Sequence, residues 1–364
     1  MFFLVFALVA AFACTLLLVR YQHKHASYSV DPSAVQSHKV HRHTVTRIGG
    51  LGILLGLLCS WLLRLLDDAN IARQGLLLLL CALPCFAGGL LEDISKRGWI
   101  ATRLTATLLS AALAGVLLDG WLTRLDVPWA DSWMGMPVVS MLFTCVAVAG
   151  VINAFNLIDG FNGLAAGVAI MILLALGYVG FKNGDILILA ASLTSVGAIL
   201  GFMLWNFPRG LIYLGDCGAY LLGFWVAELS VLLVVRNPQV SAWFPLVLCS
   251  YPVFETLFSI YRRTMLRGAH PTRPDAAHLH HMIYRRLVRW AIGTESFARQ
   301  NQRNSLTSPY LWILTSVGVL PAVVFWRYTI ALQVCTLVFA VVYVYGYARI
   351  VRFRAPRWWV IRKK

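Results

Sequence analysis

Between two long apolar runs the chain reads Asn153-Ala-Phe-Asn156-Leu-Ile-Asp159-Gly160-Phe-Asn162-Gly163-Leu164. Four polar side chains and two glycines stand here where hydrocarbon would otherwise continue. A bilayer interior has no water to satisfy carboxylates or freed backbone groups, so such a break belongs at a span end, in a polar cavity or in a site. We interpret it as part of a site. The alternative is a helix end capped by Asn and Asp beside a glycine.

The composition of the chain indicates which solvent surrounds it. Hydrophobic residues make up 59% of the 364 positions and charged residues only 13%, well below the roughly 25% of soluble domains. This predicts a polytopic membrane protein. The net charge of +16 then indicates loops held against anionic lipid or phosphorylated substrates, with no nucleic-acid partner. The eight cysteines lack paired CxxC spacing, which argues against zinc and against a disulfide framework.

Apolar runs of roughly 17 to 22 residues predict about eleven membrane spans, and therefore an all-α helix bundle in a single domain over residues 1–364. The predicted spans are 1–20, 48–66, 75–91, 101–118, 136–152, 164–181, 185–205, 216–235, 242–261, 308–326 and 329–350. The first run lacks a basic leading segment and a small-residue cleavage site, so we expect it to be a retained span.

The basic residues divide unequally between the two sets of loops. We assign about 25 of the 31 lysines and arginines to one side and about 6 to the other, which predicts an outside N-terminus and a cytoplasmic C-terminus. The segments predicted to be cytoplasmic are 21–47, 92–100, 153–163, 206–215, 263–307 and 351–364. The first five of them hold the polar motifs, so we expect them to form the active site.

The first of these segments is basic and leads into a glycine-rich helix start. Lys39 and Arg47 precede Gly49-Gly50-Leu-Gly52, an arrangement that can bind phosphate through side chains and backbone N–H groups. Ordinary anchoring of a glycine-packed helix by positive charge explains the same residues.

Carboxylates stand at two further breaks. Glu92 and Asp93 repel each other, so one is the more basic and can accept a proton or share a divalent cation, while Arg103 can meet an anionic substrate. Asp216 lies between small residues, where a carboxylate is an accessible ligand for Mg²⁺. The alternatives are a solvated helix end for the pair and a helix N-cap for Asp216.

Three histidines, His278, His280 and His281, lie in the longest cytoplasmic segment beside several arginines. Because no cysteine stands nearby, we favour hydrogen bonds to phosphate or sugar hydroxyls over a zinc site. A solvated loop is the alternative.

Four motifs follow one another along the chain. They are Gly89-Leu-Leu-Glu92-Asp93, the stretch from Asn153 to Gly167, Tyr213-Leu-Gly-Asp216-Cys-Gly, and Asp275-Ala-Ala-His278-Leu-His280-His281. In this order they resemble the polyprenyl-phosphate N-acetylhexosamine-1-phosphate transferases of glycosyltransferase family 4, in particular the WecA-like branch. The resemblance runs through most of the chain.

The resemblance implies a reaction in which undecaprenyl phosphate attacks the β-phosphate of a UDP-N-acetylsugar and UMP leaves, which initiates a cell-envelope glycan such as an O-antigen. It implies Mg²⁺, with Mn²⁺ as a substitute, held by Asn156 and Asp216. The implied catalytic residues are Glu92, Asp93 and Asp159. The implied substrate-binding residues are Lys39, Arg103, Asn162, Tyr213, His278, His280 and His281, with Asn162 and Tyr213 on the uracil.

The resemblance also implies a setting for the protein. We expect a multi-pass protein of the bacterial inner membrane with its active site on the cytoplasmic face. Its partners would be the two substrates, membrane lipids and, in a homodimer, a second copy of the chain.

Two other classes of protein stay open on the sequence. A secondary transporter would also have many spans, and Glu228 and Glu255 lie within predicted spans as a proton relay would. A non-catalytic assembly subunit would scatter its polar residues over both faces. Within the resemblance, the peptidoglycan branch, which transfers phospho-MurNAc-pentapeptide, is the other interpretation, and the sequence does not name the sugar.

Overall fold

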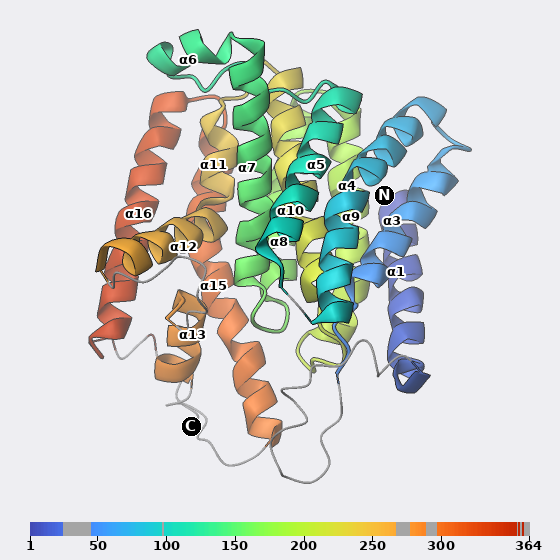
Figure 1. Ribbon diagram of the computed structural model, residues 1–364, viewed down its shortest axis with the longest axis vertical. Helices are drawn as coiled ribbons and strands as arrows, with labels where there is room; N and C mark the ends of the chain where they lie inside the picture. Colours follow the sequence, from blue (N-terminus) through green and yellow to red (C-terminus); the bar gives the residue numbers. More distant parts are fainter. Residues whose placement is uncertain are drawn as a thin grey trace.

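The computed structural model describes residues 1–24, 45–96, 98–266, 277–288 and 297–354, together with Pro356 and Trp359. Every regular element within these residues is a helix, which confirms the all-α prediction (Figure 1). The helices, with the π-helices η2 and η3, are α1 (Phe2–Arg20), α3 (Gly50–Arg64), α4 (Ala69–Ser95), α5 (Ile100–Leu118), α6 (Pro128–Met134), α7 (Pro137–Ile158), α8 (Leu164–Lys182), α9 (Ile186–Asn206), α10 (Gly215–Arg236), α11 (Trp243–Leu248), α12 (Ser250–Tyr261), η2 (Arg262–Leu266), α13 (Leu279–Ile283), η3 (Tyr284–Val288), α15 (Phe297–Phe325) and α16 (Thr329–Val351).

Nine helices in the described part of the chain are long and apolar enough to cross a membrane, which confirms a polytopic membrane protein. They are α1, α4, α5, α7, α8, α9, α10, α15 and α16, with bounds of Asn301–Phe325 for the apolar part of α15. The shorter apolar helix α3 lies among them (Figure 1). Ten of the eleven predicted spans therefore coincide with apolar helices.

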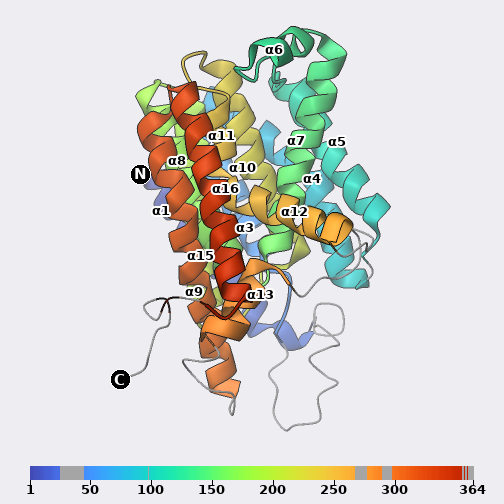
Figure 2. The same cartoon turned by 90° about the vertical axis from the view of Figure 1, so that its left-hand side faces the viewer.

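The remaining predicted span, 242–261, is wrong as a single helix. Its residues form α11, which ends at Leu248, and α12, which runs across the bundle instead of along it (Figures 1 and 2). Pro252 explains the break, because its nitrogen carries no hydrogen to donate to the carbonyl of Leu248.

Two predicted loop segments, 92–100 and 153–163, are partly helical. α4 continues through Ser95 and α7 continues through Ile158. The acidic pair of the first segment and the first two asparagines of the second therefore project from helices. A helical backbone fixes their direction more firmly than a loop would.

α10 is the central helix of the bundle, with 94% of its apolar window buried. Two glycines bring its neighbours against it. A Cβ atom on Gly89 of α4 would stand 2.6 Å from the backbone of Asp216 and Cys217, and one on Gly50 of α3 would stand 2.4 Å from Gly218. Since only glycine permits such approach, α3 and α4 pack directly on the first turn of α10.

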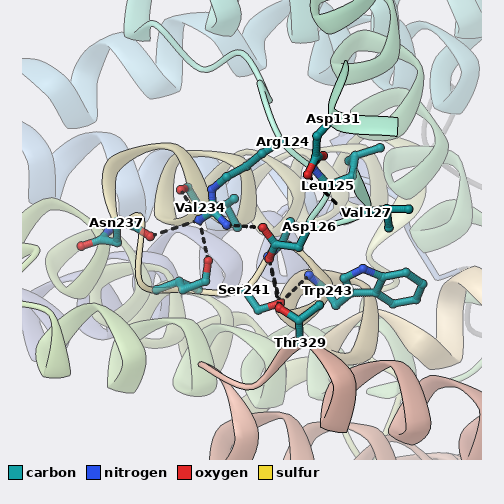
Figure 3. A network of polar contacts seen from close by, with 12 residues as sticks. Arg124, Leu125, Asp126, Val127, Asp131, Val234, Asn237, Ser241, Trp243 and Thr329 are labelled. Carbon is teal, nitrogen blue, oxygen red and sulfur yellow. Dashed lines mark hydrogen bonds and ion pairs between the residues drawn. The ribbon is translucent and has the colours of Figure 1, made fainter. Parts of the chain in front are cut away.

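The opposite end of α10 lies at what we call the far end of the bundle, where α6 and the segment between α5 and α7 are found (Figure 1). Arg124 donates to Asp126 at 2.6 Å and to the carbonyl of Val240 at 2.6 Å (Figure 3). The second oxygen of Asp126 accepts from the N–H of Ala242 at 2.7 Å and from the hydroxyl of Ser241 at 3.0 Å. These bonds fasten the segment before α7 to the turn between α10 and α11.

Candidate active site

The last turns of α4 and α7 and the first turn of α10 meet at the opposite end, which we call the site end. Here Oδ1 of Asp93 accepts the backbone N–H of Asp216 at 3.0 Å, and Oδ2 accepts that of Cys217 at 2.9 Å. The first N–H groups of a helix have no partner within it, so a carboxylate in this position stabilises α10 and fixes the backbone of Asp216. Asp216 itself lies in the first turn, and the N-cap position belongs to Leu214.

The carboxylate of Asp216 is held from α7. The amide nitrogen of Asn156 donates to Oδ1 of Asp216 at 2.7 Å. Asp159 follows α7 and belongs to the same group: burial and the charge of Asp216 raise its pKa to about 8, with Asp93 adding to the effect and Arg47 opposing it. Asp93, Asp159 and Asp216 form what we call the acidic cluster. Burial and the crowding of like charges therefore favour the protonated form of Asp159.

The acidic cluster has the donor chemistry for a hard divalent cation. Mg²⁺ binds through one or two carboxylates and takes its other ligands from water or substrate phosphates. Among the described residues no group of three or more His, Cys, Asp or Glu side chains is placed so that it could hold a metal ion by itself. Asp216 supplies one such carboxylate, and Asn156, the other predicted ligand, contacts it through its amide nitrogen. Magnesium binding stays a prediction.

Glu92 lies beside the cluster in a second polar group. It is 5% exposed, and its Oε2 accepts from Arg103 at 3.1 Å and from the hydroxyl of Tyr220 at 2.9 Å. Oε1 has no hydrogen-bond partner in the part of the chain that the structure describes. Tyr220 was not among the residues predicted from the sequence. The sequence feature that could have indicated Tyr220 is its position four residues after Asp216, because that spacing puts both side chains on one face of α10.

The segment before α3 is attached to the turn before α10. The carbonyl of Thr46 accepts the N–H of Tyr213, and the carbonyl of Tyr213 accepts the N–H of Gly49. Gly215, at φ +78°, makes this possible, because a Cβ atom there would overlap the carbonyl oxygen of Arg47. Arg47 and Tyr213 are thereby brought to the cluster, with Tyr213 37% exposed at its edge. Lys39 lies outside the described residues.

Asn162 is joined to α15. Its backbone N–H donates to Asn304 at 2.7 Å, its amide nitrogen donates to Asn301 at 3.1 Å, and its carbonyl accepts from Ser308 at 2.6 Å. The side chain is buried at 2% exposure. These contacts fix the loop after Asp159 against α15, and a role of Asn162 in binding uracil stays a prediction.

The three histidines lie on and beside α13, which packs on the same loop. The ring of His280 lies 5.6 Å from that of Phe161 and 4.3 Å from that of His281. A Cβ atom on Gly160 would stand 3.3 Å from Nε2 of His280. Burial, together with His281 and His278, lowers the pKa of His280 well below 6.5, so its ring is neutral at pH 7. The tertiary fold thus brings the histidines next to Asp159.

A cavity of about 340 Å³ lies away from these groups. Its walls are almost entirely apolar and come from α7, α10, α11 and the segment before α7, among them Leu122, Trp129, Val148, Val231 and Trp243. Without a charged side chain it cannot perform phosphate chemistry, so the acidic cluster and not this cavity is the candidate site.

The fold and the site together define an integral membrane enzyme with acids, arginines and histidines gathered at one end of a helix bundle. The model of glycosyl transferase family 4 matches residues 75–234, which include Glu92, Asp93, Asp159 and Asp216. Over these residues the chain is similar to the members of this family.

Three relatives show how far the similarity extends. The chain is 29% identical over 254 residues, 67% of each chain, to a "Probable undecaprenyl-phosphate N-acetylglucosaminyl 1-phosphate transferase" of Bacillus subtilis (strain 168). It is 27% identical to an "Undecaprenyl-phosphate alpha-N-acetylglucosaminyl 1-phosphate transferase" of Thermotoga maritima, over 70% of this chain and 73% of the relative. The protein of that name from Escherichia coli (strain K12) is 26% identical over 68% and 67%.

Proposed function

We propose that this protein transfers an N-acetylhexosamine 1-phosphate from a UDP-sugar to undecaprenyl phosphate. An oxygen of the lipid phosphate bonds to the β-phosphorus of the UDP-sugar, the bond from that phosphorus to the bridging oxygen breaks, and UMP leaves. The observation that carries the proposal is the acidic cluster at the start of α10, flanked by Arg103 and the histidines. The names of the relatives support undecaprenyl phosphate as acceptor and make N-acetylglucosamine the first sugar to test.

Phosphoryl transfer depends on positioning and on neutralising charge more than on covalent help. A Mg²⁺ ion held by Asp216 would supply that neutralisation on the diphosphate. Asp93 and Asn156 keep Asp216 in one place, by its backbone and by its carboxylate. Asp159 can take up or release a proton near neutral pH. Arg103, anchored on Glu92, offers a guanidinium to a phosphate oxygen.

We infer a cytoplasmic position for the site end from the distribution of positive charge. Six described basic residues belong to helix ends or turns at the far end, namely Arg64, Arg73, Arg124, Lys182, Arg236 and Arg327. The site end carries the larger number. An excess of lysine and arginine marks the cytoplasmic side, and the relatives are bacterial proteins, so the bacterial inner membrane follows as the proposed location.

The alternative of a secondary transporter needs polar residues near the membrane midplane. Glu255, one of the two residues that favoured a transporter, contacts His278 in residues 278–281, which we call the histidine segment. Glu228 remains a buried carboxylate within α10. The other described acids lie at helix ends or in loops, which favours chemistry at a membrane surface.

The decisive experiment is a reaction with the purified protein in detergent or nanodiscs. Undecaprenyl phosphate, Mg²⁺ and one UDP-sugar at a time are added, and UMP and lipid-linked product are measured. We expect UMP only when lipid phosphate and divalent cation are both present, and from one N-acetylated sugar above the others. UMP release without a lipid product, or none from the whole panel, would contradict the proposal.

A further inference from the structure

Glu255 is a buried carboxylate with hydrogen-bond partners on both oxygens. It projects from α12 and is 1% exposed. Its Oε1 contacts Nδ1 of His278 at 3.1 Å and accepts the backbone N–H of Leu279 at 3.0 Å. Its Oε2 accepts from the hydroxyl of Tyr343 on α16 at 2.8 Å. Two of its three partners belong to the histidine segment at the start of α13.

The contacts of His278 decide which ring nitrogen carries the proton. Nε2 of His278 lies 3.4 Å from a guanidinium nitrogen of Arg263. A guanidinium only donates, so Nε2 acts as the acceptor and the proton lies on Nδ1, where Glu255 receives it. Glu255 therefore selects one neutral tautomer of His278 and fixes the plane of its ring, as carboxylates do for histidine ligands of metals.

The ring of His278 contacts the next histidines of the segment, so its orientation affects theirs. Its ring lies parallel to that of His280, at 5.3 Å and an interplanar angle of 12°. His280 in turn contacts Phe161 and lies so near Gly160, the residue after Asp159, that a Cβ atom there would stand 3.3 Å from Nε2. An unbroken series of contacts thus leads from Glu255 to the loop that carries a member of the acidic cluster.

We propose that Glu255 is a positioning residue for the transfer reaction, which acts through His278 to set the histidine segment against the UDP-sugar. The proposal rests on the proposed function. It requires that loss of Glu255 impair what His278 does, and not only the stability of the fold.

A double-mutant cycle tests this requirement. Glu255→Met, His278→Gln and the double variant are assayed for kcat and for the KM of each substrate. We expect each single change to lower kcat/KM for the UDP-sugar about 10- to 100-fold, the usual range for a residue that orients another. The double variant should be no worse than the poorer single variant, and the KM for undecaprenyl phosphate should not move.

Tyr347→Phe is the matched control. The Tyr347 hydroxyl donates to the carbonyl of Ala277 and accepts from Arg262, so its loss removes two buried hydrogen bonds beside the same segment without touching His278. We expect Tyr347→Phe to lower kcat/KM by less than threefold. If Tyr347→Phe lowered kcat/KM as much as Glu255→Met, Glu255 would be structural only. The same conclusion would follow if the fold-losses of the two single variants multiplied in the double variant. Glu255→Gln keeps the volume of the side chain and one acceptor oxygen, so its kcat/KM for the UDP-sugar should lie between those of Glu255→Met and the wild type. This variant replaces Glu255→Met in the cycle if Glu255→Met does not fold.

A second readout does not depend on the reaction. ¹⁵N-histidine NMR of the wild type, with the His278 signals found by comparison with His278→Gln, should show the proton on Nδ1 alone. In Glu255→Met the two tautomers should exchange. An unchanged tautomer in that variant would overturn the proposal even if UMP release is measured as proposed. The expected change would support positioning by Glu255 whichever substrate the enzyme takes.

Discussion

The two ends of the bundle differ in how completely their carboxylates are paired, although Asp93 at the site end has donors on both oxygens. At the far end every acid of the network in Figure 3 is saturated: Asp131 accepts the N–H groups of Leu125 and Val127, and both oxygens of Asp126 are bonded. At the site end Oε1 of Glu92 has no partner among the described residues, and Asp159 lies close to like charges.

The difference separates acids that stabilise the fold from acids available for chemistry. A buried carboxylate with donors on both oxygens offsets its loss of hydration and lowers the free energy of the folded state. A carboxylate crowded by others raises that free energy unless it binds a proton or a cation. The predictions below test whether the two ends differ in this way.

The largest effect is expected for Asp216→Asn. The change removes the charge that a cation would need while it keeps the shape of the side chain, so UMP release should fall at least about 1,000-fold, equivalent to ~4 kcal/mol of transition-state stabilisation. Thermal unfolding should stay close to that of the wild type. Near-normal UMP release at limiting Mg²⁺ would remove Asp216 from the site.

Asp93→Asn should affect both activity and stability. An Asn side chain would turn an NH₂ group toward one of the two backbone N–H groups that Asp93 now accepts, so the first turn of α10 should loosen by about 1 to 2 kcal/mol. Because that turn carries Asp216, we expect kcat to fall about 100-fold, a drop of ~3 kcal/mol, with less effect on the KM for the UDP-sugar.

Asp68→Asn is the control for Asp93. Asp68 caps α4 at the far end and uses Oδ1 alone for the N–H groups of Asn70 and Ile71, which an Asn side chain reproduces. Stability and UMP release should both be unchanged. If Asp93→Asn behaved like Asp68→Asn, the carboxylate of Asp93 would be an ordinary cap.

Arg124→Gln should separate stability from activity at the far end. The guanidinium joins Oδ1 of Asp126 to the carbonyl of Val240, and its loss leaves these two oxygens without their donor, at a cost of about 1 to 3 kcal/mol in the free energy of unfolding. UMP release per folded molecule should not change. A loss of turnover in protein that remains folded would show that the far end takes part in the reaction.

The last comparison concerns two opposite dependences of stability on pH. Burial raises the pKa of Asp126, but the N–H of Ala242, Arg124 and Ser241 outweigh it and hold the pKa below 3.8. Its contribution is therefore present above pH 3.8 and is lost as the pH falls below it. Asp159, whose pKa is raised to about 8, contributes stability that is present below 3.8 and is lost as the pH rises toward 8.

Melting temperatures measured over a pH series without divalent cations would detect both dependences. Asp159→Asn should remove part of the decline between pH 4 and 8, and Asp126→Asn should remove part of the decline in acid. If Asp159→Asn leaves the slope above pH 4 unchanged, Asp159 is not crowded by the other acids of the cluster.

The sequence by itself determined the solvent, the helical class and nearly all of the spans, because long apolar runs admit only helices in a membrane. It also determined that Glu92, Asp93, Asp159 and Asp216 stand at breaks in those runs. These are local properties, readable from a few neighbouring residues at a time. Where a local rule was missed, as at Pro252, the predicted span 242–261 was wrong.

Only the tertiary structure decided which partner each side chain has. Asp93 meets the N–H of a residue 123 positions away, Tyr220 meets Glu92 across 128 positions, and Asn162 is held by α15. Such pairs depend on how closely α3 and α4 approach α10, which glycines permit but do not reveal in a single sequence. The division of acids into saturated and crowded ones follows from that packing, because hydrogen bonds and charge repulsion act over a few ångströms in space, whatever the separation along the chain.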